Sequence, residues 1–145
     1  MVRKIPLVLL GALFLAACAP DSSNATPIGV ELGNDHVILS TTEIGAGGVV
    51  FEIENRSSDL VHEVEVFGGA VDGALLPVSN SVADTTGLTL IDEVEDLTPG
   101  ARATLSMNLE PGTYLVLCNL PGHYGNGMWA YLAVVETAAR AHTLS

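Results

Sequence analysis

Three side chains with metal-binding donor atoms lie close together near the end of the sequence. The segment CNLPGHYGNGMW places Cys118, His123 and Met128 at five-residue intervals, and the upstream segment HEVEVFG begins with a second imidazole, His62. A soft thiolate, two imidazoles and a weak, distant thioether suit copper that alternates between Cu(II) and Cu(I), with the methionine axial. Structural zinc sites use four strong nitrogen or sulfur ligands, and calcium sites use oxygens. The donor set therefore favours copper.

The spacing of these donors has a mechanical reason. The run TYLVLC has strand character and would deliver Cys118 to one end of a β-domain, after which NLPG turns the chain so that His123 can reach the same ion. YGNG then turns it again toward the thioether. Gly122, Gly125 and Gly127 allow this curvature without Cβ conflicts. Each donor alone has an ordinary role in packing or at the surface, but their conjunction in one Gly/Pro loop favours a metal site.

The rest of the chain has strand character. Seven segments combine branched or aromatic residues with period-two or apolar runs and are bounded by turn residues, namely 30–39, 49–55, 62–68, 87–97, 101–109, 113–120 and 129–136. Val49, Phe51 and Ile53 should share one face of their strand. VDGALLPVSNSVAD is ambiguous between a short helix and a loop excursion. The pattern predicts an all-β domain, either an antiparallel sandwich or a small barrel.

The N-terminal sequence has the features of an export signal. MVRK is followed by the apolar run IPLVLLGALFLAA and by small residues before Cys18, and the run is shorter than the roughly 20 residues of a spanning helix. LAAC resembles the lipobox of bacterial lipoproteins, which implies a signal over 1–17, a lipid-modified Cys18, a flexible tether over 18–28 and one folded domain over 29–145. The protein would then be anchored on the outer face of the cytoplasmic membrane or in the periplasm. The alternative is an ordinary secreted protein in which Cys18 is incidental or removed.

The composition is strongly acidic. The formal charge is −12, and loss of Arg3 and Lys4 with the signal would change it to −14 and leave no lysine. Such a surface repels phosphate and anionic lipid, so we expect no nucleic-acid partner. It could serve docking of a basic partner, or solvation in a salty or acid-rich habitat.

The segment PGTYLVLCNLPGHYGNGMWAYLAVV resembles the C-terminal region of the type 1 blue copper proteins, the cupredoxins, and its ligand gaps are most similar to those of rusticyanin and sulfocyanin. FEIENRSSDLVHEVEVFG is similar to the family segment that supplies the first histidine. The resemblance implies a cupredoxin-like Greek-key β-sandwich that binds one type 1 copper and transfers single electrons as a monomer. His62, Cys118 and His123 would be the trigonal ligands and Met128 the axial one.

The resemblance also implies where a redox partner docks. The edge of His123 would reach the surface within an apolar patch, which we expect to consist of Leu120, Pro121, Tyr124 and Met107. A small interface there would suit a carrier that must release its partner quickly.

One residue departs from the family pattern. In plastocyanin and azurin the first ligand histidine is followed by an asparagine whose side chain ties the two ligand loops together, whereas Glu63 follows His62 here. The change bears on the hydrogen bonds around the site and on its reduction potential. Because neighbouring strand residues face opposite ways, Glu63 could simply point outward.

The predicted function is a membrane-tethered electron carrier rather than an enzyme, and three alternatives remain. A copper chaperone or storage module would tolerate an open or methionine-rich site, but the chain has only three methionines. A multicopper oxidase or copper nitrite reductase needs further histidines, commonly paired as His-x-His, and His36 and His142 form no such pair. A metal-free structural sandwich is the third alternative. EVED at 93–96 is predicted to be a solvated edge rather than an acid/base pair.

Overall fold

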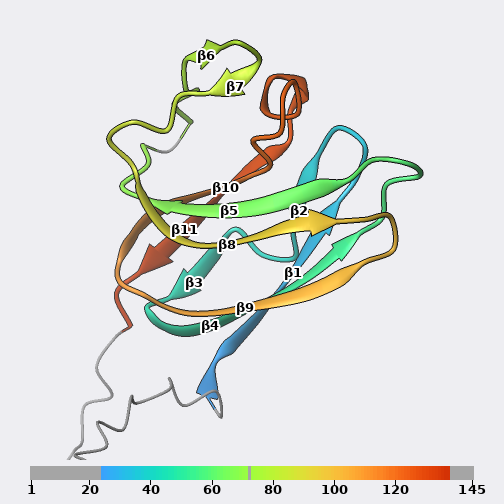
Figure 1. Cartoon of the computed structure of the whole chain (residues 1–145). Helices are drawn as coiled ribbons and strands as arrows, with labels where there is room; N and C mark the ends of the chain where they lie inside the picture. The colour runs from blue at the N-terminus through green and yellow to red at the C-terminus, as the bar shows by residue number, and fades with distance from the viewer. Residues whose placement is uncertain (1–23, 72, 138–145) are drawn as a thin grey trace, which may run out of the picture.

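The computed structural model describes residues 24–71 and 73–137, which form a sandwich of two β-sheets with a small hairpin at one end (Figure 1). The strands and the single 3-10 turn labelled within these ranges follow one another as β1 (Thr26–Leu32), β2 (Val37–Leu39), β3 (Glu43–Gly45), β4 (Gly47–Asn55), β5 (His62–Gly68), β6 (Val78–Ser79), β7 (Val82–Ala83), β8 (Thr89–Leu97), β9 (Arg102–Leu109), β10 (Gly112–Leu117), η2 (Tyr124–Asn126) and β11 (Trp129–Val135). The predicted all-β sandwich is confirmed.

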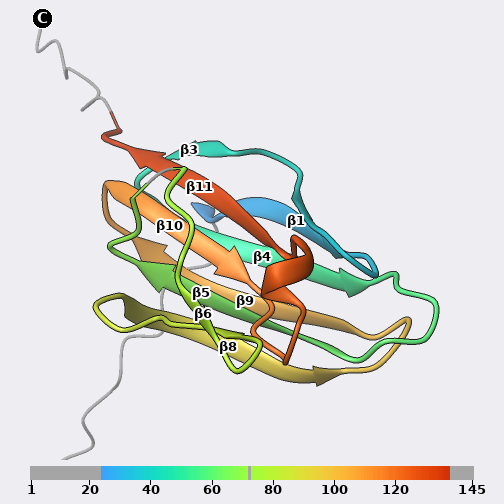
Figure 2. The same cartoon turned by 90° about the horizontal axis from the view of Figure 1, so that it is seen from above.

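The two sheets are mixed rather than antiparallel. Sheet A has the order β2-β1-β4-β9 and sheet B the order β3-β11-β10-β5-β8, with β6 and β7 paired separately. Figure 2 shows the sheets from above. β1 lies parallel to β4, and β3 lies parallel to β11. The antiparallel expectation is wrong for these two pairs because the chain leaves sheet A after β2, adds β3 to sheet B, and only then returns as β4.

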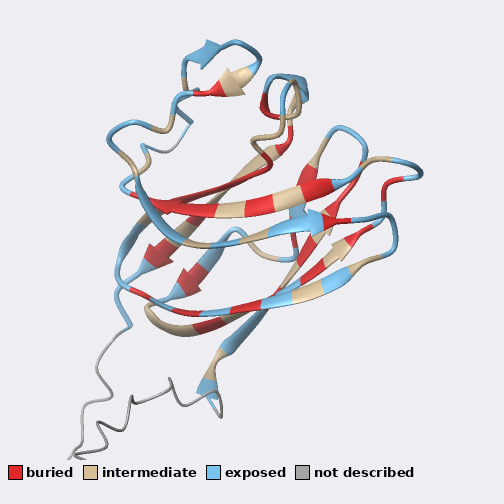
Figure 3. Ribbon diagram, viewed as in Figure 1, coloured by how far each residue is buried: buried red, intermediate tan, exposed pale blue. Residues whose placement is uncertain are grey.

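Side-chain alternation fills the space between the sheets. Val49, Phe51 and Ile53 of β4 are almost completely buried, as predicted from their shared parity. Sheet B is covered on its outer face as well, because the chain between β5 and β8 folds over it (Figure 3). A second cluster forms there from Phe67, Ala83, Leu115, Leu117 and Tyr124. In its described residues, 71 and 73–84, the ambiguous segment contains the β6–β7 hairpin and no helix.

The folded domain begins earlier than the predicted boundary at residue 29. β1 starts at Thr26, and Ile28, assigned above to the tether, is fully buried in the core. Strand pairing explains the difference, since residues 26 to 32 all pair with β4. The proposed signal and Cys18 lie outside the described residues. Within those residues, no helix has the length and apolar character needed to cross a membrane.

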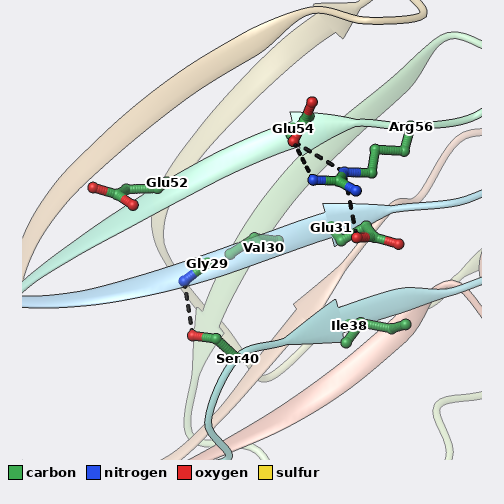
Figure 4. A pocket seen from close by; sticks show the side chains of 8 residues that line it. All are labelled: Gly29, Val30, Glu31, Ile38, Ser40, Glu52, Glu54 and Arg56. Atoms are coloured by element: carbon green, nitrogen blue, oxygen red, sulfur yellow. Dashed lines mark hydrogen bonds and ion pairs between the residues drawn. The ribbon is translucent and has the colours of Figure 1, made fainter.

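Ion pairs gather on the outer face of sheet A. Arg56 contacts Glu54 at 2.9 Å and Glu31 at 3.4 Å across adjacent strands (Figure 4). Arg102 of β9 contacts the same Glu54 at 2.6 Å. These arginines are the strong cations in the described part of the chain, and both are engaged with carboxylates away from sheet B.

Candidate metal centre

Antiparallel pairing of β5 with β10 brings the predicted ligands to one end of the sandwich. β5 begins at His62, and β10 ends at Leu117, immediately before Cys118. In the register of these strands Leu117 lies opposite Glu65, so the residues that follow Leu117 run past the start of β5. Side-chain parity directs both His62 and Cys118 toward the sandwich interior, where each is fully buried.

Three donor atoms converge at this end. The Cys118 Sγ lies 3.2 Å from the His123 Nδ1 and 3.8 Å from the His62 Nδ1, and the two Nδ1 atoms are 3.1 Å apart. The bonds of about 2.0 to 2.3 Å that a metal ion makes to such ligands would separate trigonal donors by about 3.5 to 3.8 Å. The donor set thus fits one type 1 copper after small adjustments. It is the one group of three or more His, Cys, Asp or Glu ligands found in residues 24–71 and 73–137.

The electrostatics of these residues also fit a cation. Burial, with a smaller contribution from neighbouring His123, lowers the pKa of His62, and burial lowers the pKa of His123. Both rings therefore favour the neutral form that ligates metals. Burial raises the pKa of the Cys118 thiol, although backbone N–H groups of Glu63 and Leu120 oppose the rise. A bound cation would stabilise the thiolate that this environment otherwise disfavours.

The orientation of the His62 ring is consistent with ligation through Nδ1. Its Nε2 atom is buried and makes no hydrogen bond of ordinary geometry, although the Gly33 backbone is close enough to raise the pKa of His62 slightly against the burial effect. A ligating imidazole usually directs its second nitrogen at a backbone carbonyl or carboxylate, which fixes the tautomer. Among the described residues, the buried Nε2 of His62 has no such partner.

The loop after Cys118 is closed by backbone hydrogen bonds that hold residue 128 beside the other ligands. The Met128 carbonyl accepts from the Cys118 N–H at 3.0 Å, and the Met128 N–H donates to the His123 carbonyl at 3.2 Å. The Met128 side chain is fully buried. Gly122 and Gly127 adopt positive φ angles of 88° and 110°, as the curvature of the loop requires.

Asn119 is a site-supporting residue that sequence reasoning missed. Its side chain accepts from the Ala83 N–H at 2.8 Å and donates to the Ala83 carbonyl at 3.3 Å, so it binds both backbone groups of one residue of β7. The Gly122 N–H adds a 2.7 Å bond to the Ser81 carbonyl. The hairpin and η2 lie side by side in Figure 1. An asparagine directly after the cysteine was visible in the sequence, but nothing there indicated its partner.

Glu63 also has a definite role in the network. Its N–H donates to the Cys118 Sγ at 3.5 Å, and its Oε1 accepts from the Asn119 N–H at 2.9 Å. The side chain lies on the outer face of sheet B, as strand alternation predicts. It is hydrogen-bonded there rather than free in solvent. It ties the segment that carries His62 to the loop that carries Cys118.

Two residues of the predicted docking patch are misplaced. Tyr124 is 3% exposed and packs under the hairpin, where its hydroxyl accepts from the Leu76 N–H, and Met107 is 6% exposed in the core. Leu120 is partly buried and Pro121 is exposed beside the partly exposed His123. The surface near His123 is therefore smaller than predicted.

His36 and residues 93–96 lie at the surface, as predicted. His36 lies in the turn between β1 and β2, where its exposed ring contacts Asp35. Residues 93–96 lie on β8, the edge strand of sheet B, with their carboxylates largely exposed. His142 lies outside the described residues.

Comparison with known proteins agrees with this geometry. Residues 81–144 match the family model of the sulfocyanin (SoxE) domain. The match includes the loop that carries Cys118, His123 and Met128. No curated protein matches the sequence.

Solved structures show the same fold at low sequence identity. Auracyanin from Roseiflexus castenholzii is 22% identical, with a TM-score of 0.56 over 77% of this chain and 98% of that chain. Rusticyanin from Thiobacillus ferrooxidans is 16% identical, with a TM-score of 0.55 over 74% of this chain and 75% of that chain. A multi-copper oxidase from Pediococcus acidilactici is also 16% identical, with a TM-score of 0.55 over 93% of this chain and 32% of that chain.

Because an oxidase shares the fold, the fold alone does not distinguish a carrier from an enzyme. Two further observations are the cluster of His62, Cys118 and His123 and the match of residues 81–144 to the sulfocyanin (SoxE) domain. Residues 81–144 thus resemble the sulfocyanin (SoxE) domain, the described fold resembles those of auracyanin and rusticyanin, and His62, Cys118 and His123 form a cluster that could hold a metal ion.

Proposed function

We propose that the protein is a blue copper electron carrier that binds one type 1 copper through His62, Cys118, His123 and Met128. The observation that carries the proposal is the convergence of two imidazole nitrogens and one thiol at the end of a rigid sandwich. When bound there, copper supplies a single-electron change between Cu(II) and Cu(I).

The chain's own residues would keep the centre nearly unchanged during electron transfer. His62 and Cys118 sit on paired strands, and hydrogen bonds from Met128 close the remaining loop. Three of the four ligand side chains are fully buried, which excludes water from the donors. A preorganised, dry site of this kind limits rearrangement when charge changes.

Electron exchange would occur through His123, the ligand that is only partly buried. A redox partner would dock on the small surface formed by His123, Leu120 and Pro121, and a small interface permits rapid release. We propose a monomer whose partners are larger redox proteins. The closed site offers no specific support for the alternative, a copper chaperone or storage module.

The N-terminal segment supports a membrane-tethered location. We propose that the signal over 1–17 is removed and that lipid on Cys18 anchors the domain outside the cytoplasm, with the chain up to β1 as its tether. Mass spectrometry of the mature protein tests this directly. An acylated N-terminal Cys18 is expected, whereas an unmodified N-terminus at another residue would contradict the anchor.

Copper titration followed by visible absorption tests the carrier function. One Cu(II) per chain should produce an intense thiolate-to-copper band that disappears in Cys118→Ser, and the band should bleach and return over repeated reduction and oxidation. A colourless copper complex would instead support the chaperone or storage module. Failure to bind copper would contradict both the carrier and the chaperone or storage function.

A further inference from the structure

Glu63 makes two hydrogen bonds that bracket the predicted thiolate ligand. Its backbone N–H donates to the Cys118 Sγ, and its side-chain Oε1 accepts from the backbone N–H of Asn119, the next residue. A single residue on β5 therefore holds two consecutive residues of the ligand loop. Because Glu63 directly follows His62, this tie fixes the separation between the two ligand-bearing segments.

The strand geometry accounts for this arrangement. Parity places His62 and Cys118 inside the sandwich and places Glu63 on the outer face of sheet B, where the chain leaving β10 passes over it. On the other side of β5, the pairing with β8 is irregular between His62 and Val64, and Asp96 there has a φ of 55°. A bulge of this kind bends the strand locally and is frequent beside functional sites.

Among the described residues, none forms an ion pair with the Glu63 carboxylate. The charged groups that face it from β8 are Glu93, Glu95 and Asp96, all acidic. In the described ranges, the ion pairs of Arg56 and Arg102 lie on sheet A. The negative charge of Glu63 therefore acts on the Cys118 sulfur with little compensation from neighbouring cations, and a partly buried charge is screened weakly by salt.

We propose that Glu63 is a positioning residue of the copper centre, which both holds the Cys118 loop in place and lowers the reduction potential through its negative charge. The inference rests on the proposed function. A negative charge beside the thiolate favours Cu(II), the more positive ion, over Cu(I). The hydrogen bond that Glu63 accepts from the Asn119 N–H ties the ligand loop to β5, and this tie carries a charge.

Three variants separate the hydrogen bond from the charge. Glu63→Gln keeps an oxygen acceptor for the Asn119 N–H and removes the charge, while Glu63→Ala removes both. Glu93→Gln is the matched control, since it removes a carboxylate from the same face without touching the ligand loop. Two measurements apply to all of them: the midpoint potential with the thiolate-to-copper spectrum, and the hydrogen exchange of the Asn119 amide by NMR in the copper-free and Cu(I) proteins.

The inference predicts a distinct result for each variant. Glu63→Gln should raise the potential more than Glu93→Gln does, with an unchanged spectrum and a protected Asn119 amide. Glu63→Ala should raise the potential, alter the spectrum and speed exchange of the Asn119 amide. A potential in Glu63→Gln no higher than that of Glu93→Gln would overturn the charge effect, and a protected Asn119 amide in Glu63→Ala would overturn the positioning role. Exchange of the Asn119 amide in the copper-free protein tests the hydrogen bond independently of copper binding. If the proposed function is wrong, the unmodified protein will show no thiolate-to-copper band.

Discussion

At the scale of single residues, the centre depends on which way each side chain faces along β5 and β10. His62 and Cys118 face the sandwich interior, while Glu63 and Asn119 face the hairpin side of sheet B. The inward-facing pair supplies donor atoms to the metal site, and the outward-facing pair holds the ligand segments in place. A shift of one residue in the register of β10 would turn Cys118 outward and Asn119 inward while His62 and Glu63 stayed in place, since neighbouring strand positions face opposite ways. The regular pairing of β10 with β5 and β11 protects against such a shift.

Glu65 gives this face a measurable pH dependence. Burial, reinforced by the charges of Glu63, Glu93 and Glu95, raises the pKa of Glu65 from 4.5 to about 7, and its Oε2 is buried without a hydrogen bond. The folded protein thus holds this proton more tightly than the unfolded chain. The contribution to stability is complete below pH 4.5 and is lost as the pH rises to about 7.

We therefore expect Glu65→Gln to be more stable than the unmodified protein at pH 8, by about 1 to 2 kcal/mol once solvent screening of a half-buried carboxylate is included. The difference should shrink toward zero below pH 4.5, where the carboxyl becomes protonated in both states. Denaturant unfolding of the copper-free proteins across this range measures it. Glu52→Gln, at an exposed position on sheet A, is the control. A constant difference between Glu65→Gln and the unmodified protein at every pH would contradict the prediction.

At the scale of elements, local patterns predicted most strands but not their partners. Period-two alternation located β4, β5 and β11 because each buries alternate residues against one core. The parallel pairing of β1 with β4 depends on contacts between distant segments, which no local pattern encodes. The β6–β7 hairpin was not predicted because its strands are only two residues each. Tyr124 was misplaced because its burial depends on the segment that covers sheet B. The burial of Met107 instead follows from its alternation with Leu105 and Leu109 in β9.

The end of η2 offers a test of how tightly the loop is built. Gly127 terminates this turn with a φ of 110°, and a Cβ there would lie 3.1 Å from the Asp35 carbonyl oxygen. Gly125, two residues earlier, has open space around its would-be Cβ and no positive φ. A substitution at Gly127 therefore introduces backbone strain and a close contact, whereas the same substitution at Gly125 introduces neither.

We expect Gly127→Ala to lower the free energy of unfolding by about 1 to 3 kcal/mol, the usual cost of such backbone strain. Gly125→Ala should change it by well under about 1 kcal/mol. Because Met128 follows directly, Gly127→Ala should also shift the thiolate-to-copper spectrum, and Gly125→Ala should not. Equal stability losses in the two variants, measured by denaturant unfolding, would show that the loop tolerates rearrangement around Gly127.

At the scale of the whole molecule, charge is distributed unevenly between the two faces. The arginines of the described residues are neutralised by Glu31 and Glu54 on sheet A. The outer side of β5 and β8 instead carries a run of carboxylates, namely Glu63, Glu65, Glu93, Glu95 and Asp96. With a formal charge of −12 over the chain, the field at the copper end is negative.

This field should decide how salt affects electron exchange. Opposite charges attract a cationic oxidant toward the protein, and salt screens the attraction over a Debye length of about 10 Å at 0.1 M. The rate of oxidation of the reduced protein by tris(phenanthroline)cobalt(III) should therefore fall as ionic strength rises, while the rate with ferricyanide, an anion, should rise. Stopped-flow absorbance of the thiolate-to-copper band measures both. Because each oxidant is the other's control, parallel changes in the two rates would mean that salt acts on the protein itself rather than on encounter, and the steering argument would fail.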